Sequence, residues 1–221
     1  MKKLLLLLMI VPMIGFGQNK YTWKDVQKKE GVVLLKSTKE PVTGIVEGIG
    51  GFIPKWMLEI DYNIHHAVFE NGKQISCIAY YKNGEVQHKR EKNNDLTIIY
   101  TTYYKNGQIK NEGIEDYEGN RNGISKEYDI DGTLLTEGFY KTEEKDGLWK
   151  DYNSDGQLFT EITYKDGKFD GSFNVYWENG QLKKQGNHKD GKYHGLLTKY
   201  NKDGEVTKET RWENGKKVKS D

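Results

Sequence analysis

A tandem unit of 24 residues fills the C-terminal half of this 221-residue sequence, and it constrains the fold more than any other feature. Four copies align without gaps. Two glycine columns, a tyrosine column and an aliphatic column keep the spacing strictly, and a looser column holds aromatic residues or histidine. This register indicates repeated structural units. The columns are Gly123, Gly147, Gly171 and Gly195; Tyr128, Tyr152, Tyr176 and Tyr200; Gly132, Gly156, Gly180 and Gly204; Leu134, Leu158, Leu182 and Val206; and Tyr140, Tyr164, His188 and Trp212.

The turns give the unit its predicted structure. Thirteen of the 25 glycines directly follow Asn or Asp, and such pairs favour type I′ hairpin turns, in which both central residues have positive φ. In the second unit the pairs at Gly156 and Gly167 enclose a segment of strand length. Connections this short require antiparallel pairing. The sequence therefore predicts an all-β fold of tandem antiparallel β-hairpin repeats that form an elongated meander sheet.

The two faces of this sheet both carry aromatic side chains. Trp149 and Tyr152 are three residues apart, which places them on opposite faces of a regular strand unless a bulge intervenes. Leu158, Thr160 and Ile162 share one face, and the residues between them share the other. A single twisted sheet is therefore favoured over a sandwich with one dry core.

The repeat pattern weakens toward the N-terminus. Four regular units occupy residues 123–218, and degenerate hairpin units are predicted over residues 67–122. Residues 18–66 form an N-terminal segment with an irregular loop. Within it, residues 21–30 are predicted to be a short helix or a first strand, residues 41–47 the strand that starts the array, and residues 48–54 the Gly- and Pro-rich loop.

Residues 1–17 have the pattern of a signal peptide. A positive start precedes an apolar run and small residues, and cleavage is predicted between Gly17 and Gln18. An uncleaved anchor is the alternative, but the run is shorter than the roughly 20 residues that a spanning helix needs. We expect a periplasmic or secreted chain without a transmembrane segment after cleavage.

The charge of the remaining chain is balanced. Removing Lys2 and Lys3 from 34 Lys and Arg leaves 32 cationic side chains against 33 Asp and Glu. This balance gives no electrostatic footprint for nucleic acid, so none is expected as a partner.

Motifs of catalysis and metal binding do not appear in the sequence. It has no nucleophile elbow, phosphate-binding loop or zinc-protease motif. His65 and His66 are adjacent and would point to opposite faces of a strand, which makes a poor metal site. Cys77 lies in an apolar run, where a buried thiol is favoured over a nucleophile. We expect no enzyme, no cofactor and no metal.

Aromatic residues that vary on the regular scaffold are the candidates for binding a partner, because protein interfaces favour Trp and Tyr. The alternative is cross-strand packing within the sheet, which is favoured for two of them, Trp149 and Phe173. The candidates are Trp149, Phe173, Trp177, Tyr193 and Trp212.

The unit G-x-W-x-x-Y-x-x-[DN]-G-x-L, followed by Tyr-x-[DN]-Gly-Lys, resembles the bacterial variant of the MORN repeat. The second unit, which begins at Gly147, carries it most clearly. Residues 41–217 as a whole resemble the YwqK-like antitoxin family. That resemblance implies a protein that neutralises a toxin by direct contact, without catalysis. Here the export signal and the break in register over residues 48–64 depart from the simple pattern.

Three functions follow in order of preference. The first is an exported protein-binding scaffold, an antitoxin or immunity-like factor whose partner is a toxin-like or envelope protein. The second is a structural or carbohydrate-binding protein of the cell envelope. The third is an enzyme, which would need a deep cleft that a simple sheet does not make.

Overall fold

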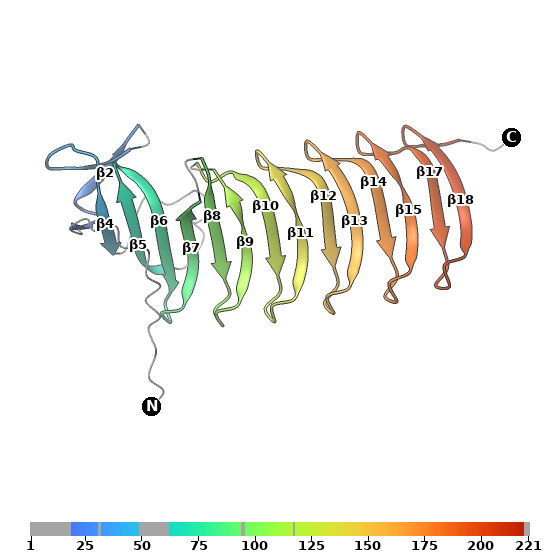
Figure 1. The fold of residues 1–221 in the computed structure, drawn as a ribbon, viewed down its shortest axis with the longest axis horizontal. Helices are drawn as coiled ribbons and strands as arrows, with labels where there is room; N and C mark the ends of the chain where they lie inside the picture. Colours follow the sequence, from blue (N-terminus) through green and yellow to red (C-terminus); the bar gives the residue numbers. More distant parts are fainter. Residues whose placement is uncertain (1–18, 31, 49–61, 94–95, 117, 219–221) are drawn as a thin grey trace, which may run out of the picture.

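A computed structural model describes residues 19–30, 32–48, 62–93, 96–116 and 118–218. Over these residues the protein is all-β, and its strands form one long open sheet and a separate two-stranded hairpin (Figure 1). The predicted signal peptide with its cleavage site lies outside the described residues, as do residues 49–54 of the predicted loop. The described part contains no helix long and apolar enough to cross a membrane.

The strands are short and follow one another closely along the chain. They are β1 (Lys20–Thr22), β2 (Val26–Lys29), β3 (Val32–Leu35), β4 (Gly44–Gly48), β5 (Tyr62–Glu70), β6 (Lys73–Tyr81), β7 (Val86–Lys92), β8 (Ile98–Tyr103), β9 (Ile109–Glu115), β10 (Arg121–Tyr128), β11 (Leu134–Lys141), β12 (Glu144–Tyr152), β13 (Leu158–Lys165), β14 (Lys168–Tyr176), β15 (Leu182–Lys189), β16 (Lys192–Tyr193), β17 (Gly195–Tyr200), β18 (Val206–Glu213) and β19 (Lys216–Lys217).

The sheet is a meander. From β4 to β19, each strand pairs antiparallel with the next strand along the chain, except that β15 pairs with both β16 and β17, which His194 separates. The strands therefore lie side by side in chain order from one end of the array to the other (Figure 1). Among the strands that the structure describes in this sheet, β1 alone breaks the rule, because it adds to β4 in parallel. The predicted elongated meander sheet is confirmed.

The predicted type I′ turns occur at one end of the hairpins. Both central residues have positive φ at Asn71–Gly72, Asp166–Gly167, Asp190–Gly191 and Asn214–Gly215. In the first regular unit the same turn is made by Thr142 and Glu143, both also at positive φ.

The other end of each regular unit uses a different turn, so the type I′ prediction for Asp155–Gly156 is wrong. Only Gly156 has positive φ, at 76°. Its N–H donates to the Asn153 carbonyl at 2.9 Å, and the Asn153 side-chain oxygen accepts the N–H groups of Asp155 and Gln157 at 3.0 and 2.9 Å. This is a type I turn followed by a left-handed glycine. It forms because the Asn153 amide stabilises the turn two residues before the Asp-Gly pair.

β-Bulges recur where these turns join the strands. The register shifts between Asp151 and Tyr152, and again at the equivalent place in the other regular units. Trp149 lies opposite Ile162, whereas the Tyr152 hydroxyl donates to Glu137 on the other face. Trp149 and Tyr152 thus face opposite sides, as strand alternation predicts.

One face of the sheet, here called the core face, carries directly opposed residues from β4 to β15, with one register shift between β11 and β12. The β2–β3 hairpin covers this face at the N-terminal end, where it encloses a small apolar core that includes Val33, Val46 and Cys77. The opposite face is called the charged face. The row on the core face is Val46, Ala67, Cys77, Arg90, Tyr100, Gly113, Ser125 and Gly138, then Trp149, Ile162, Phe173 and Gly186.

The N-terminal predictions are met in part. Residues 21–30 form neither one helix nor one strand; they hold the end of β1, a turn and β2, and Asp25 closes that turn by accepting the Thr22 N–H at 2.8 Å. The predicted strand over residues 41–47 appears as β4, which begins only at Gly44. Gly48, predicted to open a loop, is the last residue of β4 and lies opposite His65.

Candidate protein-binding surface

The type I′ turns bring aromatic residues face to face on the core side. A two-residue turn places the second residue before each turn pair opposite the second residue after it. Tyr164 therefore lies opposite Phe169, and His188 lies opposite Tyr193. Their ring centroids are 4.9 and 4.6 Å apart.

These pairs join into one continuous set of touching rings, here called the aromatic ladder. Successive centroids along it lie between 4.6 and 6.2 Å apart, within the range of favourable aromatic pairs. The ladder runs from β11 to β18 and therefore spans all four regular units. Its members are Tyr140, Trp149, Tyr164, Phe169, Phe173, His188, Tyr193 and Trp212.

Two rings form the buried base of the ladder. Trp149 is 3% exposed and Phe173 is 4% exposed. Each lies on a glycine of a neighbouring strand, Trp149 on Gly138 of β11 and Phe173 on Gly186 of β15. A Cβ at Gly138 would overlap the Trp149 indole, and one at Gly186 would lie 2.9 Å from Phe173 Cε1. The Trp149 indole N–H also donates to the Phe139 carbonyl at 3.1 Å. Glycine thus lets the rings rest directly on the backbone.

Three cationic side chains cover the rings. The Arg121 guanidinium lies 3.8 Å from the Tyr140 centroid, and Lys145 Nζ lies 3.9 Å from the Trp149 centroid. Lys184 Nζ is 4.8 Å from the Tyr193 centroid and donates to the Tyr193 hydroxyl at 2.8 Å. Cations at these distances are attracted to the ring faces.

Burial among the rings lowers the pKa of two side chains, Lys145 and His188. It lowers the pKa of Lys145 below its usual range, with nearby Arg121 acting in the same direction. Burial, followed by the charge of Lys184, lowers the pKa of His188, so this imidazole favours its neutral form. The surface therefore presents Lys145 as a partly desolvated charge among aromatic rings, and the half-buried Lys184 lies among rings of the same ladder.

The structure places the five predicted partner-binding residues in three different environments. Trp149 and Phe173 pack against neighbouring strands, as the cross-strand alternative expects. Tyr193 and Trp212 are half-buried ladder members. Trp177 lies elsewhere, at the opposite end of the strands, where its indole N–H donates to the Tyr200 carbonyl at 3.4 Å.

Several residues of this surface were missed by the sequence reasoning. Phe169, which is 37% exposed, and the cations Arg121 and Lys145 were not singled out. A signal was present, because residues 121, 145, 169, 193 and 217 form another column at the 24-residue spacing, occupied by a cation or an aromatic residue.

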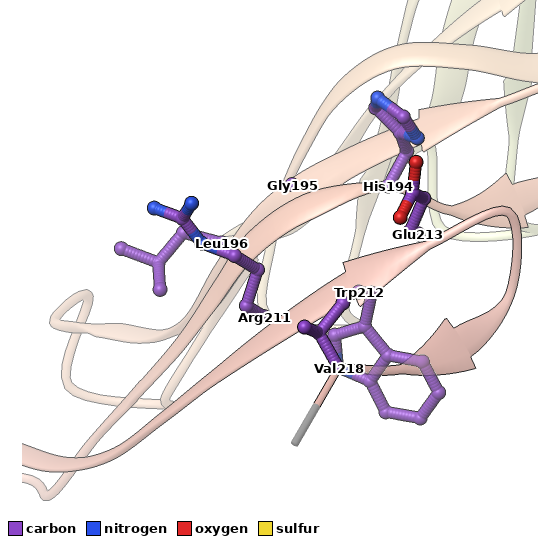
Figure 2. Close-up of a pocket in the computed structure, with 7 residues that line it drawn as sticks. All are labelled: His194, Gly195, Leu196, Arg211, Trp212, Glu213 and Val218. Atoms are coloured by element: carbon purple, nitrogen blue, oxygen red, sulfur yellow. The ribbon is translucent and has the colours of Figure 1, made fainter. Parts of the chain in front are cut away.

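A shallow hollow lies where the ladder reaches the C-terminal hairpin. Figure 2 shows Trp212 and Val218 next to each other, with His194 near Glu213 on a separate side of the strand. Arg211 and Leu196 are directly opposed across β17 and β18. The hollow thus extends the aromatic surface toward mixed charges. Its lining residues are His194, Gly195, Leu196, Arg211, Trp212, Glu213 and Val218.

The tyrosine column stabilises the charged face instead. Tyr128, Tyr152 and Tyr176 each donate a hydroxyl hydrogen bond to a carboxylate of the preceding strand, at 2.7–2.8 Å. Burial and the bond to Glu112 raise the pKa of Tyr128 to about 12, and burial with the bond to Glu137 does the same for Tyr152.

The second glycine column of the repeat occupies left-handed turn positions, with φ between 76° and 90°. Its members are Gly132, Gly156, Gly180 and Gly204.

The remaining polar candidates have structural surroundings. Cys77 is 2% exposed, and burial raises the pKa of its thiol to about 11, which confirms the buried-thiol prediction. Among the described residues, no three His, Cys, Asp or Glu side chains are grouped so that they could hold a metal ion.

The geometry defines an open repeat protein of β-hairpins. The family model of the MORN repeat variant matches the chain over residues 96–114, 145–166 and 169–190. Each match covers one hairpin except for a terminal residue, around a left-handed glycine turn, namely β8–β9, β12–β13 and β14–β15. MORN repeat proteins are generally non-catalytic scaffolds. The chain matches no curated protein.

Proposed function

We propose that the protein is an exported, non-catalytic scaffold that binds a partner protein through the aromatic ladder and its cations. The continuity of the ladder across four units carries this proposal. Repeat proteins commonly bind through one extended surface of this kind. Aromatic side chains and arginine are also the groups that contribute most to protein interfaces.

The chemistry of the surface specifies the partner. Lys145 and Lys184 are held over rings and partly removed from water, so an acidic group of a partner would gain a strong interaction there. Phe169, Tyr193 and Trp212 of the same ladder keep part of their apolar area accessible. The partner is therefore a protein that presents carboxylates beside apolar side chains.

The biological role that we propose is that of an antitoxin or immunity-like factor, which neutralises a toxin-like or envelope protein by covering it. The resemblance of residues 41–217 to the YwqK-like antitoxin family supports this role, and the signal-peptide pattern supports a location in the periplasm or outside the cell. Such neutralisation requires contact only, so no catalytic residue is needed.

Capture from the envelope fraction tests the proposal. The immobilised protein should retain a partner, and Lys145→Glu/Lys184→Glu should weaken that binding at least about tenfold, because the partner's carboxylates would then face like charges. Lys165→Glu, at the exposed end of β13, is the matched control and should bind normally. Failure to retain any protein, or equal retention by the double variant, contradicts the proposal.

Carbohydrate binding is the second candidate, favoured by the row of closely spaced rings. Sugars stack on open ring faces, however, and the cations already cover the faces of Tyr140, Trp149 and Tyr193. This occupancy favours a protein partner. Affinity electrophoresis in cell-wall and extracellular polysaccharides separates the two, because retardation that Phe169→Ala abolishes would support the sugar.

A further inference from the structure

We infer that the charged face between β9 and β12 is an interface between two copies of this chain. The inference concerns the face opposite the aromatic ladder and does not depend on the proposed partner. The evidence for this interface is two parallel rows of side chains on the charged face, one of charged residues and one of apolar residues.

The charged row alternates in sign. Glu112 lies opposite Lys126, Lys126 opposite Glu137, and Glu137 opposite Lys150. The outer pairs are loose, with Lys126–Glu112 at 3.8 Å and Lys150–Glu137 at 3.9 Å, and their side chains are 31–37% exposed. All four charges can therefore still meet an opposite charge from another molecule.

The apolar row lies two residues away along the same strands. Ile114 lies on β9, Ile124 on β10, Phe139 on β11 and Leu148 on β12, and Ile124 is directly opposite Phe139. Ile124 is 56% exposed, Phe139 42% and Leu148 48%. Ile114 is half-buried. Exposed apolar side chains gathered on one sheet face mark an interaction site.

Toward the N-terminus the apolar row includes Ile99 of β8, which lies opposite Ile114 and is 42% exposed, and toward the C-terminus it ends at β12. On β13 and β14 its positions are taken by Thr163 and Ser172, whose hydroxyl oxygens lie 3.4 Å apart. The apolar surface thus coincides with the alternating charges, over strands that lie next to one another in Figure 1.

Symmetry identifies the occupant as a second copy. A two-fold axis parallel to the strands, between β10 and β11, reverses the order of the strands in the facing molecule. Glu112 then faces Lys150 of the other copy, and Lys126 faces its Glu137, so all four positions meet opposite charges. The same axis places Ile124 against Phe139 of the other copy. A two-fold interface needs this self-complementarity, and face-to-face sheets pack in this way.

Charge reversals in a mixing experiment test the inference. In Lys126→Glu or Glu137→Lys alone, the axis sets two pairs of like charges against each other, so the dimer dissociation constant should rise at least about tenfold. Mixed in equal amounts, the two variants restore four opposite pairs in the heterodimer. Sedimentation velocity at low ionic strength should therefore show monomers for each variant and dimers for the mixture and the unaltered protein.

An apolar substitution supplies the matched control. Ile124→Ser should shift the protein to monomer, whereas Leu196→Ser should not, because Leu196 occupies the same column of the repeat outside the proposed interface and is also exposed. Amide hydrogen exchange verifies that each variant is folded. A monomeric unaltered protein, dimers that persist in both single variants, or a mixture that stays monomeric would each overturn the inference.

Discussion

Gly138→Ala should be among the most damaging small substitutions in the regular array. The added Cβ would overlap Cδ2 and Cε2 of the Trp149 indole and lie 2.7 Å from its Cγ, so the ring must move. Overpacking of this kind costs about 1–3 kcal/mol. Loss of the indole hydrogen bond to the Phe139 carbonyl adds about 1 kcal/mol. The expected loss of stability is therefore about 2–4 kcal/mol around β11 and β12.

Native-state hydrogen exchange measures this loss locally, which suits a repeat array in which units can open separately. Protection should fall in β11 and β12 and remain in β17 and β18. Trp149→Phe should rescue part of the loss, since the equivalent residue of the next unit is Phe173. The matched control is Gly180→Ala, which meets no atom within 4 Å and has only the strain of its φ of 79°, about 1 kcal/mol.

The packing account is wrong if Gly138→Ala costs no more than Gly180→Ala. It is equally wrong if Trp149→Phe adds to the damage instead of relieving it, because the two substitutions would then be independent.

Three further predictions concern single side chains. The pKa of His188 is lowered in the folded protein, so its contribution to stability is full above the unfolded pKa of about 6.5 and is lost as the pH falls below that value. His188→Phe should therefore lose less thermal stability than the unaltered protein between pH 8 and pH 5. Equal decreases in melting temperature in the two proteins would refute this. Tyr176→Phe should cost about 1 kcal/mol in urea unfolding at pH 7. That cost should shrink as the pH is lowered below the ordinary glutamate value of about 4.3, because the Tyr176 bond lowers the pKa of Glu161 and its contribution is lost as the pH falls through the lowered pKa; an unchanged cost at acidic pH would count against it. Gly156→Val should cost about 1–2 kcal/mol from backbone strain at φ 76°, and hydrogen exchange should rise only near the turn; global unfolding would contradict a local role.

The sequence predicted the meander well because its information is local. Turn pairs and strand lengths repeat every 24 residues, and neighbouring strands pair with neighbours. The turn at Gly156 was misread because the side chain that decides its type, Asn153, lies outside the Asp-Gly pair. The parallel addition of β1 to β4 could not be foreseen, since it joins segments that share no turn.

The candidate surface was predicted less completely. Tyr193 and Trp212 were found because they vary on a regular scaffold. The burial of Trp149 depends on Gly138 of the neighbouring strand, which leaves room for the indole. The sequence does not show that these two residues meet, because their contact depends on the register between the two strands. Lys145 was missed because its column at the 24-residue spacing mixes cations with aromatic residues, and the reason for that mixture appears only in the position of Lys145 over the Trp149 ring.

Site-specific photo-crosslinking tests the central claim most directly. Phe169 and Ser172 are both exposed residues of β14, the first in the aromatic ladder and the second on the charged face. A photoreactive phenylalanine analogue at each position, irradiated in cells, compares the two faces in one strand. The account predicts a covalent adduct with a distinct protein from position 169 that is lost in Lys145→Glu/Lys184→Glu. No protein adduct from position 169, or one that persists in that variant, would contradict it.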